Sequence, residues 1–449
     1  MHKIIAGFVY LVFFHYSYVT FVNPQYEYAG YNYNEVSPIL CIFTYLICLL
    51  PLLFSVKTSS PAYSGICLIY SICYIPAQFM MGFSSEMSTS MIALSQSVLG
   101  ISMIYLLKSS KWGWVHCTNG SNKKNTKIEY TGNKRMELMI LGATIFSLLI
   151  LLDSYHQTMR LVSLEEIYDL RLGANATDRG DLVNYTSMWL GSCFLPYFFS
   201  IGYIHRRLTP ILIAMLGSLL LYAAMGSKAA IFMAIMMGYI YYITRDSEKD
   251  LMRSVLSTLS VIVLFVTLVI PEEGMWLLVK AVIIVRTIVV AGWTMVAYES
   301  FFSENGYTYY THIGPVNYVF ESYPYGSLGL GRVIGLKYSG TTDVNFNANF
   351  WASDGFAALG LIGIPIATVA LSLFIYILNR VSIYYSPRFV ALWLTGFWLV
   401  LLNAPVTTSI LSGGGAIIVL LLAIYSPQKN RTVGPILSRS RFEILRIAK

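Results

Sequence analysis

Long apolar runs separated by short polar segments recur along most of this chain. Each run has about 17–25 residues, enough to cross a hydrocarbon core of about 30 Å as a helix. The pattern therefore predicts an all-α polytopic membrane protein with about twelve transmembrane helices. The predicted spans lie near residues 3–22, 37–56, 61–81, 88–107, 136–156, 186–204, 208–225, 228–244, 254–270, 355–378, 389–404 and 409–425.

Composition supports the membrane class. Apolar residues make up 56% of the 449 residues and charged residues 12%, about half the charge density of an average soluble domain. The mean hydropathy is +0.62. We expect one integral membrane domain over residues 1–449 instead of several soluble domains. The six cysteines form no CxxC pair, so a disulfide framework or a zinc site is not expected.

The loops between the predicted spans differ sharply in charge. Segments 108–135, 205–207 and 245–253 are rich in Lys and Arg, whereas 23–36 and 82–87 contain neither. Basic loops remain in the cytoplasm, so this asymmetry predicts a cytoplasmic N-terminus. It also explains the net charge of +8 without nucleic acid. The basic tail 426–449 is predicted to be cytoplasmic as well.

The parity of the spans gives one segment an unusual path. Nine spans from a cytoplasmic N-terminus end outside near residue 271, and the last three spans require residues 300–354 to be outside. The stretch 271–300 must then begin and end on the same face, so we predict a re-entrant or interfacial helix. Lys280 and Arg286 lie within it, and a cation is tolerated at membrane depth where it lines a cavity.

Two long outer loops, 157–185 and 300–354, complete the predicted topology. Eight basic residues map to the outer side, where orientation rules do not place them. Arginine can bind a phosphate through two parallel hydrogen bonds, and a helix that begins at Lys228 adds its own attraction for anions. A site for a lipid-linked pyrophosphate is one interpretation, and pairing with acidic residues of a solvated loop is the other. The eight are Arg160, Arg171, Arg179, Lys228, Lys280, Arg286, Arg332 and Lys337.

The second outer loop contains a histidine and many aromatic residues. His312 is a candidate general base, because a histidine titrates near neutral pH, or else a hydrogen-bonding loop residue. Glu299, Glu304 and Asp354 compete for the base role. The rings and the amides Asn345, Asn347 and Asn349 suit sugar binding, although Tyr and Trp also favour membrane interfaces. The aromatic residues are Tyr307, Tyr309, Tyr310, Tyr318, Tyr323, Tyr325, Tyr338 and Trp351. Metal-binding and nucleotide-binding motifs such as HExxH or a P-loop do not occur in a suitable place.

The chain resembles the Wzy-type O-antigen (oligosaccharide repeat-unit) polymerases of Gram-negative bacteria. The matching features are the Arg-containing first outer loop and the GSK turn at 226–228. Further matches are Arg286 followed by Gly292, Tyr298 and FFSEN at 301–305, then THIGPVNYVFESYP at 311–324 and NANFWASDGFAALGLIG at 347–363. The turn has Lys228 where the family often has Arg, which keeps the cation but loses the bidentate geometry.

The resemblance implies a GT-C-like glycosyltransferase at the periplasmic face of the bacterial inner membrane. It would transfer the growing glycan from undecaprenyl pyrophosphate to a new lipid-linked repeat unit, without a cofactor or metal. In this scheme His312 is the base, and Arg286 and Arg171 bind the donor pyrophosphate. Lys228 and Arg179 support them, Arg332 orients the acceptor, and Tyr298 and Asn347 contact substrate. The implied partners are membrane lipids, a chain-length regulator and a flippase, with no nucleic acid.

Two other functions share part of this pattern. An O-antigen ligase has similar topology and chemistry but uses lipid A-core as the acceptor. A lipid-linked oligosaccharide flippase or other transporter would place cations along a path through several spans. The spans before residue 276 contain almost no internal Lys or Arg, which favours an enzyme.

Overall fold

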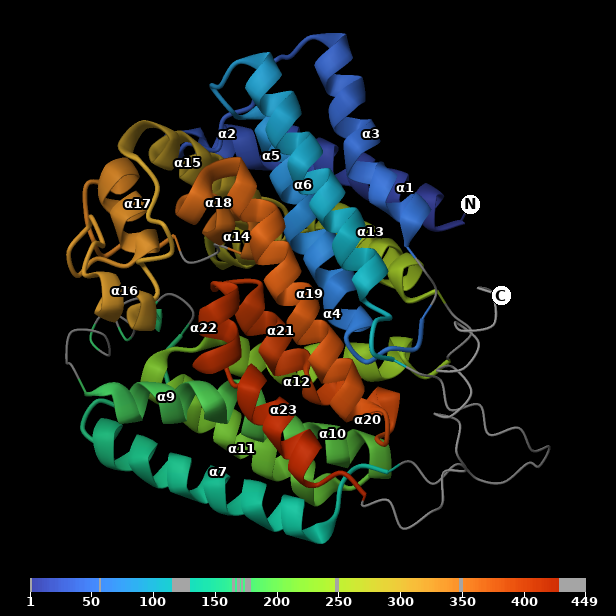
Figure 1. Cartoon of the computed structure of the whole chain (residues 1–449), viewed down its shortest axis with the longest axis vertical. Coiled ribbons are helices and arrows are strands. Elements are labelled where there is room, and N and C mark those ends of the chain that lie inside the picture. The colour runs from blue at the N-terminus through green and yellow to red at the C-terminus, as the bar shows by residue number, and fades with distance from the viewer. Residues whose placement is uncertain are drawn as a thin grey trace, which may run out of the picture.

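The computed structural model describes residues 2–55, 58–114, 130–163, 166–167, 170, 173, 179–246, 250–346 and 350–427. Within these residues the chain is all-helical (Figure 1), as the apolar pattern predicts. The first part contains α1 (His2–Ser17), α2 (Asn23–Tyr26), α3 (Pro38–Phe54), α4 (Tyr63–Leu68), α5 (Ile75–Phe83), α6 (Thr89–Ser109), α7 (Lys134–Tyr155), α9 (Asp181–Trp189), α10 (Leu195–His205), α11 (Leu208–Met225), α12 (Lys228–Ile243) and α13 (Leu251–Val269). The second part contains α14 (Gly274–Ile288), α15 (Val290–Asn305), α16 (Gly314–Phe320), α17 (Leu330–Ser339), α18 (Trp351–Leu359), α19 (Gly363–Ser382), α20 (Pro387–Trp393), α21 (Thr395–Leu401), α22 (Val406–Leu411) and α23 (Gly415–Ile424).

Several of these helices are long and apolar enough to cross a membrane. Seven helical runs among the described residues meet that criterion, or up to eight if the bent pair α14–α15 counts as one span. Every predicted span coincides with at least one helix, but some of those helices, such as α3 and α23, are shorter. The fold is consistent with a polytopic membrane protein, and the count of twelve spans stays a prediction.

Three of the long helices widen into a π-helical turn just before a proline. The turns are Tyr18–Val22, Ile69–Tyr74 and Leu190–Phe194, and the prolines are Pro24, Pro76 and Pro196. A proline lacks the N–H of the regular helical bond, and its ring collides with the carbonyl four residues before it. The local widening accommodates both effects, so these helices continue through the proline.

The helices form two groups that the C-terminal helices join (Figure 1). One group contains α1, α3, α5, α6 and α13, and the other contains α7 and α9–α12. Helix α19 packs on α6 and on α23, while α20 packs on α10 and α12. The C-terminal helices thus bridge two parts of the chain that are far apart in sequence.

Helix α18 reverses direction before α19. The backbone turns at Gly360, which has a φ of +61°, a conformation that favours glycine. The Trp351 indole then donates a hydrogen bond of 2.8 Å to the Thr368 hydroxyl. Gly355 and Gly363 touch so closely that a Cβ on either would collide with the backbone of the other. Because α18 lies alongside α19, the predicted span 355–378 is divided at Gly360, and the membrane-length segment is α19.

The segment predicted to be re-entrant consists of two helices bent by 56°. In α14 the buried Lys280 ammonium donates to the Thr267 and Ile270 carbonyls at the end of α13 and to Glu272, at 2.8, 3.3 and 2.7 Å. In α15 the Trp293 indole donates to the Gly30 carbonyl at 2.9 Å. Thr267, Ile270 and Gly30 all lie at helix ends or loops predicted to be outer. All three contacts lie on the predicted outer side, and the re-entrant path of this segment stays a prediction.

Loop contacts sort into two ends of the bundle. At the predicted inner end, Ser386 N–H donates to the Tyr130 carbonyl, and the Thr131 hydroxyl is 2.9 Å from the His205 ring. At the predicted outer end, Asn34 N–H donates to the Phe83 carbonyl, and the Tyr222 hydroxyl donates to the Val162 carbonyl. Each of these bonds joins two segments that the charge pattern places on the same face, and the orientation itself stays a prediction.

Candidate functional site

The most specific polar arrangement at the predicted outer end is a buried pair formed by His312 and Asp354. The His312 Nε2 atom lies 2.9 Å from the Asp354 Oδ1 atom, although the residues are 42 positions apart. Their side chains are only 5% and 3% exposed. Buried polar groups persist where they are paired, so each residue makes the burial of the other possible. The two residues compete as bases in the sequence, but in the structure they are partners.

Local backbone contacts hold this pair together. Helix α18 carries Asp354 in its first turn, where the helix dipole favours a negative charge. The last turn of the same helix leaves carbonyl groups without helical partners. Thr308 and Tyr309 donate their N–H groups to two of them, Ala357 and Ala358, both at 2.9 Å. The loop that carries His312 is thereby fixed against α18.

Thr308 completes a hydrogen-bonded chain. Its hydroxyl lies 2.8 Å from His312 Nδ1 and 3.2 Å from the Ala357 carbonyl. The hydroxyl has one proton. When the imidazole is neutral, the hydroxyl donates this proton to Nδ1. When it is an imidazolium, Nδ1 donates to the hydroxyl, and the hydroxyl donates to the Ala357 carbonyl. Both protonation states of His312 can therefore be accommodated, with Asp354 accepting from Nε2 in each.

Two adjacent tyrosines beside this pair have strained backbones. Tyr309 and Tyr310 have φ values of +50° and +63°, a conformation that costs a residue with a side chain roughly 1–2 kcal/mol. The Tyr310 hydroxyl is buried and has no hydrogen-bond partner among the described residues. Burial and the nearby Asp354 charge raise its pKa to about 12, so at neutral pH it remains a donor. Strain and an unused donor next to a polar pair are typical of functional sites.

Arg286 occupies an exposed position at the break between α14 and α15. It is in the last turn of α14, and its Nη1 atom lies 3.4 Å from the Asn403 side-chain oxygen, after α21. That distance is long for a hydrogen bond. The guanidinium keeps donors that can bind an anion.

The other predicted cations divide into structural and exposed ones. The Arg179 guanidinium donates to the Ser154 carbonyl at 3.1 Å and covers the Tyr155 ring at 4.1 Å, so it anchors the first outer loop to α7. Lys280 is held inside the fold. Lys228 is half-buried at the start of α12, just after Gly226 with a φ of +61°. Arg332 is exposed on α17, whereas Arg171 and Asn347 lie outside the described residues.

The aromatic residues of the second outer loop are also unequal. Tyr298 is fully buried and packs on Phe302, with its hydroxyl 3.5 Å from the Phe346 carbonyl. Its ring is therefore not presented at the surface of the protein. Tyr309 and Tyr318 are 68% and 87% exposed and present their rings outward. Of the other candidate bases, Glu299 is fully buried beneath the surface and Glu304 is exposed.

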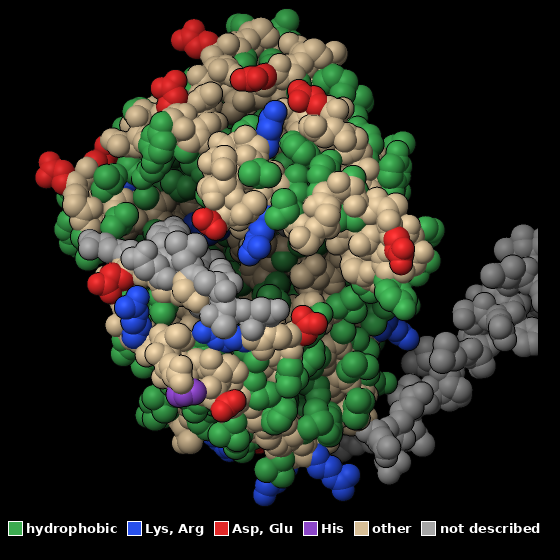
Figure 2. All heavy atoms as spheres, turned by 90° about the vertical axis from the view of Figure 1, so that its left-hand side faces the viewer, with side chains coloured by type: hydrophobic (Ala, Val, Ile, Leu, Met, Phe, Trp, Pro, Cys, Tyr) green, Lys and Arg blue, Asp and Glu red, His purple; other side chains and the backbone are tan. Residues whose placement is uncertain are grey.

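The surface on this side of the molecule is hollowed. Figure 2 faces the side formed by α9 and α15–α17 and shows a depression near its centre with Lys and Arg side chains at the rim. The sequence does not predict a site role for Thr308, for the Tyr310 hydroxyl or for the contact between Asn403 and Arg286. Only the position of Thr308 four residues before His312 is a signal there. Among the described residues, no three His, Cys, Asp or Glu side chains gather as a metal site.

Comparisons with protein-family models, with curated proteins and with solved structures found no match.

Proposed function

We propose that this chain is an O-antigen polymerase of the Wzy type, with a GT-C-like fold, in the bacterial inner membrane. It joins oligosaccharide repeat units carried on undecaprenyl pyrophosphate at the periplasmic face and releases undecaprenyl pyrophosphate. The observation that carries the proposal is the buried His312–Asp354 pair next to two strained tyrosines. An anchor for the membrane alone has no need for a buried acid–base pair.

The chemistry follows from these groups. A hydroxyl of the acceptor sugar takes the place of the Thr308 hydroxyl at His312 Nδ1 and transfers its proton there. Its oxygen bonds to the anomeric carbon of the donor glycan as the bond from that carbon to the pyrophosphate oxygen breaks. Asp354 accepts a hydrogen bond from Nε2 and stabilises the imidazolium that forms.

Arg286 stabilises the negative charge that develops on the leaving pyrophosphate. With Arg286 exposed at the break of α14–α15, the pyrophosphate can lie at the bilayer surface while its polyprenyl chain remains in lipid. Arg171 and Lys228 are assigned to the same group in support. In the structure Arg179 holds the loop, and we infer that it acts by positioning Arg171. Arg332 remains assigned to the acceptor.

Deletion of the encoding gene tests the function directly. We expect lipopolysaccharide that carries a single repeat unit on its core and has lost the ladder of longer chains. The measurement is gel analysis of lipopolysaccharide from the deletion strain and from the strain restored with the gene. Loss of every repeat unit, including the first, would instead indicate a ligase or a flippase and would contradict the proposal.

Replacement of Tyr310 by Phe tests the unused donor. A buried hydroxyl without a partner costs about 1–3 kcal/mol, so the thermal unfolding midpoint should stay the same or rise. If the hydroxyl binds acceptor sugar, the rate at low acceptor concentration should fall about two- to tenfold, the value of one neutral hydrogen bond. Rates measured over a range of acceptor concentrations check this.

The matched control is Tyr309→Phe, which keeps an exposed ring on the neighbouring residue with the same backbone conformation. We expect wild-type rates for it. An unchanged rate in Tyr310→Phe would show that the buried hydroxyl has no role in binding.

A further inference from the structure

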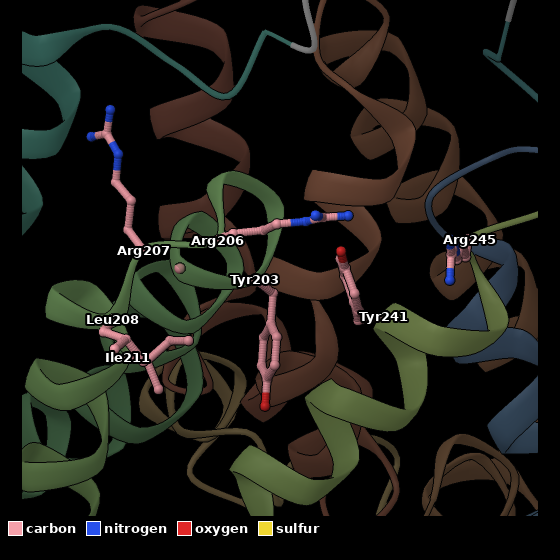
Figure 3. Close-up of a pocket in the computed structure, with 8 residues that line it drawn as sticks. Tyr203, Arg206, Arg207, Leu208, Ile211, Tyr241 and Arg245 are labelled. Carbon is pink, nitrogen blue, oxygen red and sulfur yellow. The ribbon is translucent and has the colours of Figure 1, made fainter.

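A second candidate site lies at the predicted inner end, away from His312. It is a pocket of about 440 Å³ between the end of α10 and the end of α12 (Figure 3). Pockets that bind small ligands measure about 300–1,000 Å³. The walls include Tyr203, Arg206, Arg207, Leu208, Tyr241 and Arg245.

The pocket is basic. Arg206, Arg207 and Arg245 contribute three guanidinium groups, and none of the described lining residues is acidic. None of the three forms a salt bridge with a described residue. Figure 3 shows the Arg206 side chain extending across the pocket toward the Tyr241 hydroxyl, while Arg207 points away and Arg245 lies on the far side. The arrangement attracts an anion that several donors can bind at once.

The tyrosine walls are fixed in place. The Tyr203 hydroxyl donates to the Ala234 carbonyl at 3.0 Å, and its ring stacks on Tyr241 with centroids 5.5 Å apart. On the other side Arg388 donates to the Tyr241 carbonyl at 2.8 Å and covers the Tyr241 ring at 3.7 Å. A ligand therefore meets walls that are already ordered, which lowers the entropic cost of binding.

The backbone at Arg206 gives independent support. Arg206 ends α10 with a φ of +53°, where glycine is the usual residue because it has no Cβ penalty. Loop orientation requires positive charge near this end of the bundle, but it does not require an arginine at a position whose positive φ strains the backbone.

We propose that this pocket binds the phosphodiester headgroup of an anionic glycerophospholipid from the inner leaflet. The Arg206 and Arg245 guanidinium groups bind the phosphate, and Leu208, which is 74% exposed beside the pocket, contacts the acyl chains. Basic pockets between helices on the cytoplasmic side bind anionic lipid headgroups by this chemistry. The site is independent of the polymerase reaction.

The probe is phosphatidylglycerol, compared with zwitterionic phosphatidylethanolamine and with soluble glycerol 3-phosphate. Each is added to the purified full chain in neutral detergent while the thermal unfolding midpoint is followed. Phosphatidylglycerol should raise the midpoint with saturation, and the other two should leave it unchanged. An equal rise with phosphatidylethanolamine would overturn the proposal. An equal rise with glycerol 3-phosphate would show that the pocket binds a soluble phosphate instead of a lipid.

Arg206→Gly separates charge from stability. It removes a guanidinium and relieves the positive φ, so the lipid-free midpoint should stay the same or rise while the lipid-induced shift shrinks. Combined with Arg245→Gln, it should weaken the apparent affinity for phosphatidylglycerol about tenfold or more.

The matched control is Lys134→Gln with Arg135→Gln, which removes two exposed charges at the start of α7, outside the pocket. We expect no change in affinity. Equal weakening by the control pair would assign the effect to diffuse surface charge and contradict a built site.

Discussion

His312→Gln is expected to lower the rate of repeat-unit polymerisation by about 10²- to 10⁴-fold, the range for loss of a positioned general base. The substitution is chosen because a glutamine amide places an N–H close to the position of Nε2. Asp354 then keeps its donor in a site where it is 3% exposed, and the fold should persist. The glutamine offers nothing basic toward Thr308. The measurement is polymer formation by purified protein from lipid-linked repeat units, with the unfolding midpoint recorded in parallel.

His156→Gln is the control for this experiment. His156 follows α7 at the predicted outer end, is exposed, and bonds through Nδ1 to the Asp153 carbonyl at 2.7 Å. Its replacement should leave the rate unchanged. If His312→Gln still makes chains of full length, the general base is a carboxylate instead of His312. If the unfolding midpoint falls sharply, the His312–Asp354 pair has a purely structural role.

Arg286→Ala is expected to reduce polymerisation by about 10²- to 10³-fold, comparable to loss of one donor that stabilises a developing negative charge. Stability should change by no more than about 0.5 kcal/mol, since the side chain is exposed and has one long contact. Arg286→Lys should recover part of the rate, because it restores the charge but not the two parallel donors. The rate and the chain-length distribution on gels measure the outcome.

Arg160→Ala is the matched control, since Arg160 is also an exposed arginine predicted at the outer side. It should retain normal rates and chain lengths. If Arg286→Ala inserts normally and still makes chains of full length, the assignment of Arg286 to the pyrophosphate is wrong. Lys280 on the same helix is unsuitable for this comparison because it is buried and bonded to Glu272.

The apolar pattern predicts most of the helices because a helix that crosses a membrane requires a long apolar run. Such a run is recognised from its own sequence, without knowledge of the helices that pack against it. Predicted spans such as 88–107 and 208–225 correspond to α6 and α11 within about two residues. The pattern fails at 355–378 because a hydropathy run is the same whether the chain continues or folds back. The reversal depends on Gly360 and on the close approach of Gly355 to Gly363.

The candidate site is less accessible to sequence reasoning. His312, Arg286 and Asp354 stand out as individual polar residues in apolar or aromatic surroundings. Which of them meet depends on how α18 is oriented against the loop that follows α15. The positive φ values of Tyr309 and Tyr310, like the unused Tyr310 hydroxyl, have no sequence signature, since tyrosine rarely adopts that conformation.

The sequence by itself determined the all-helical membrane class and the charge asymmetry that predicts orientation, because both depend on the composition of local segments. Tertiary structure decided which charges are available. Packing buries Lys280 and holds Arg179 against α7, but it leaves Arg286 exposed. It also brings His312 into contact with Asp354, which is 42 residues away in the sequence. Burial and pairing are properties of contacts between distant segments, and such contacts exist only once the helices have packed.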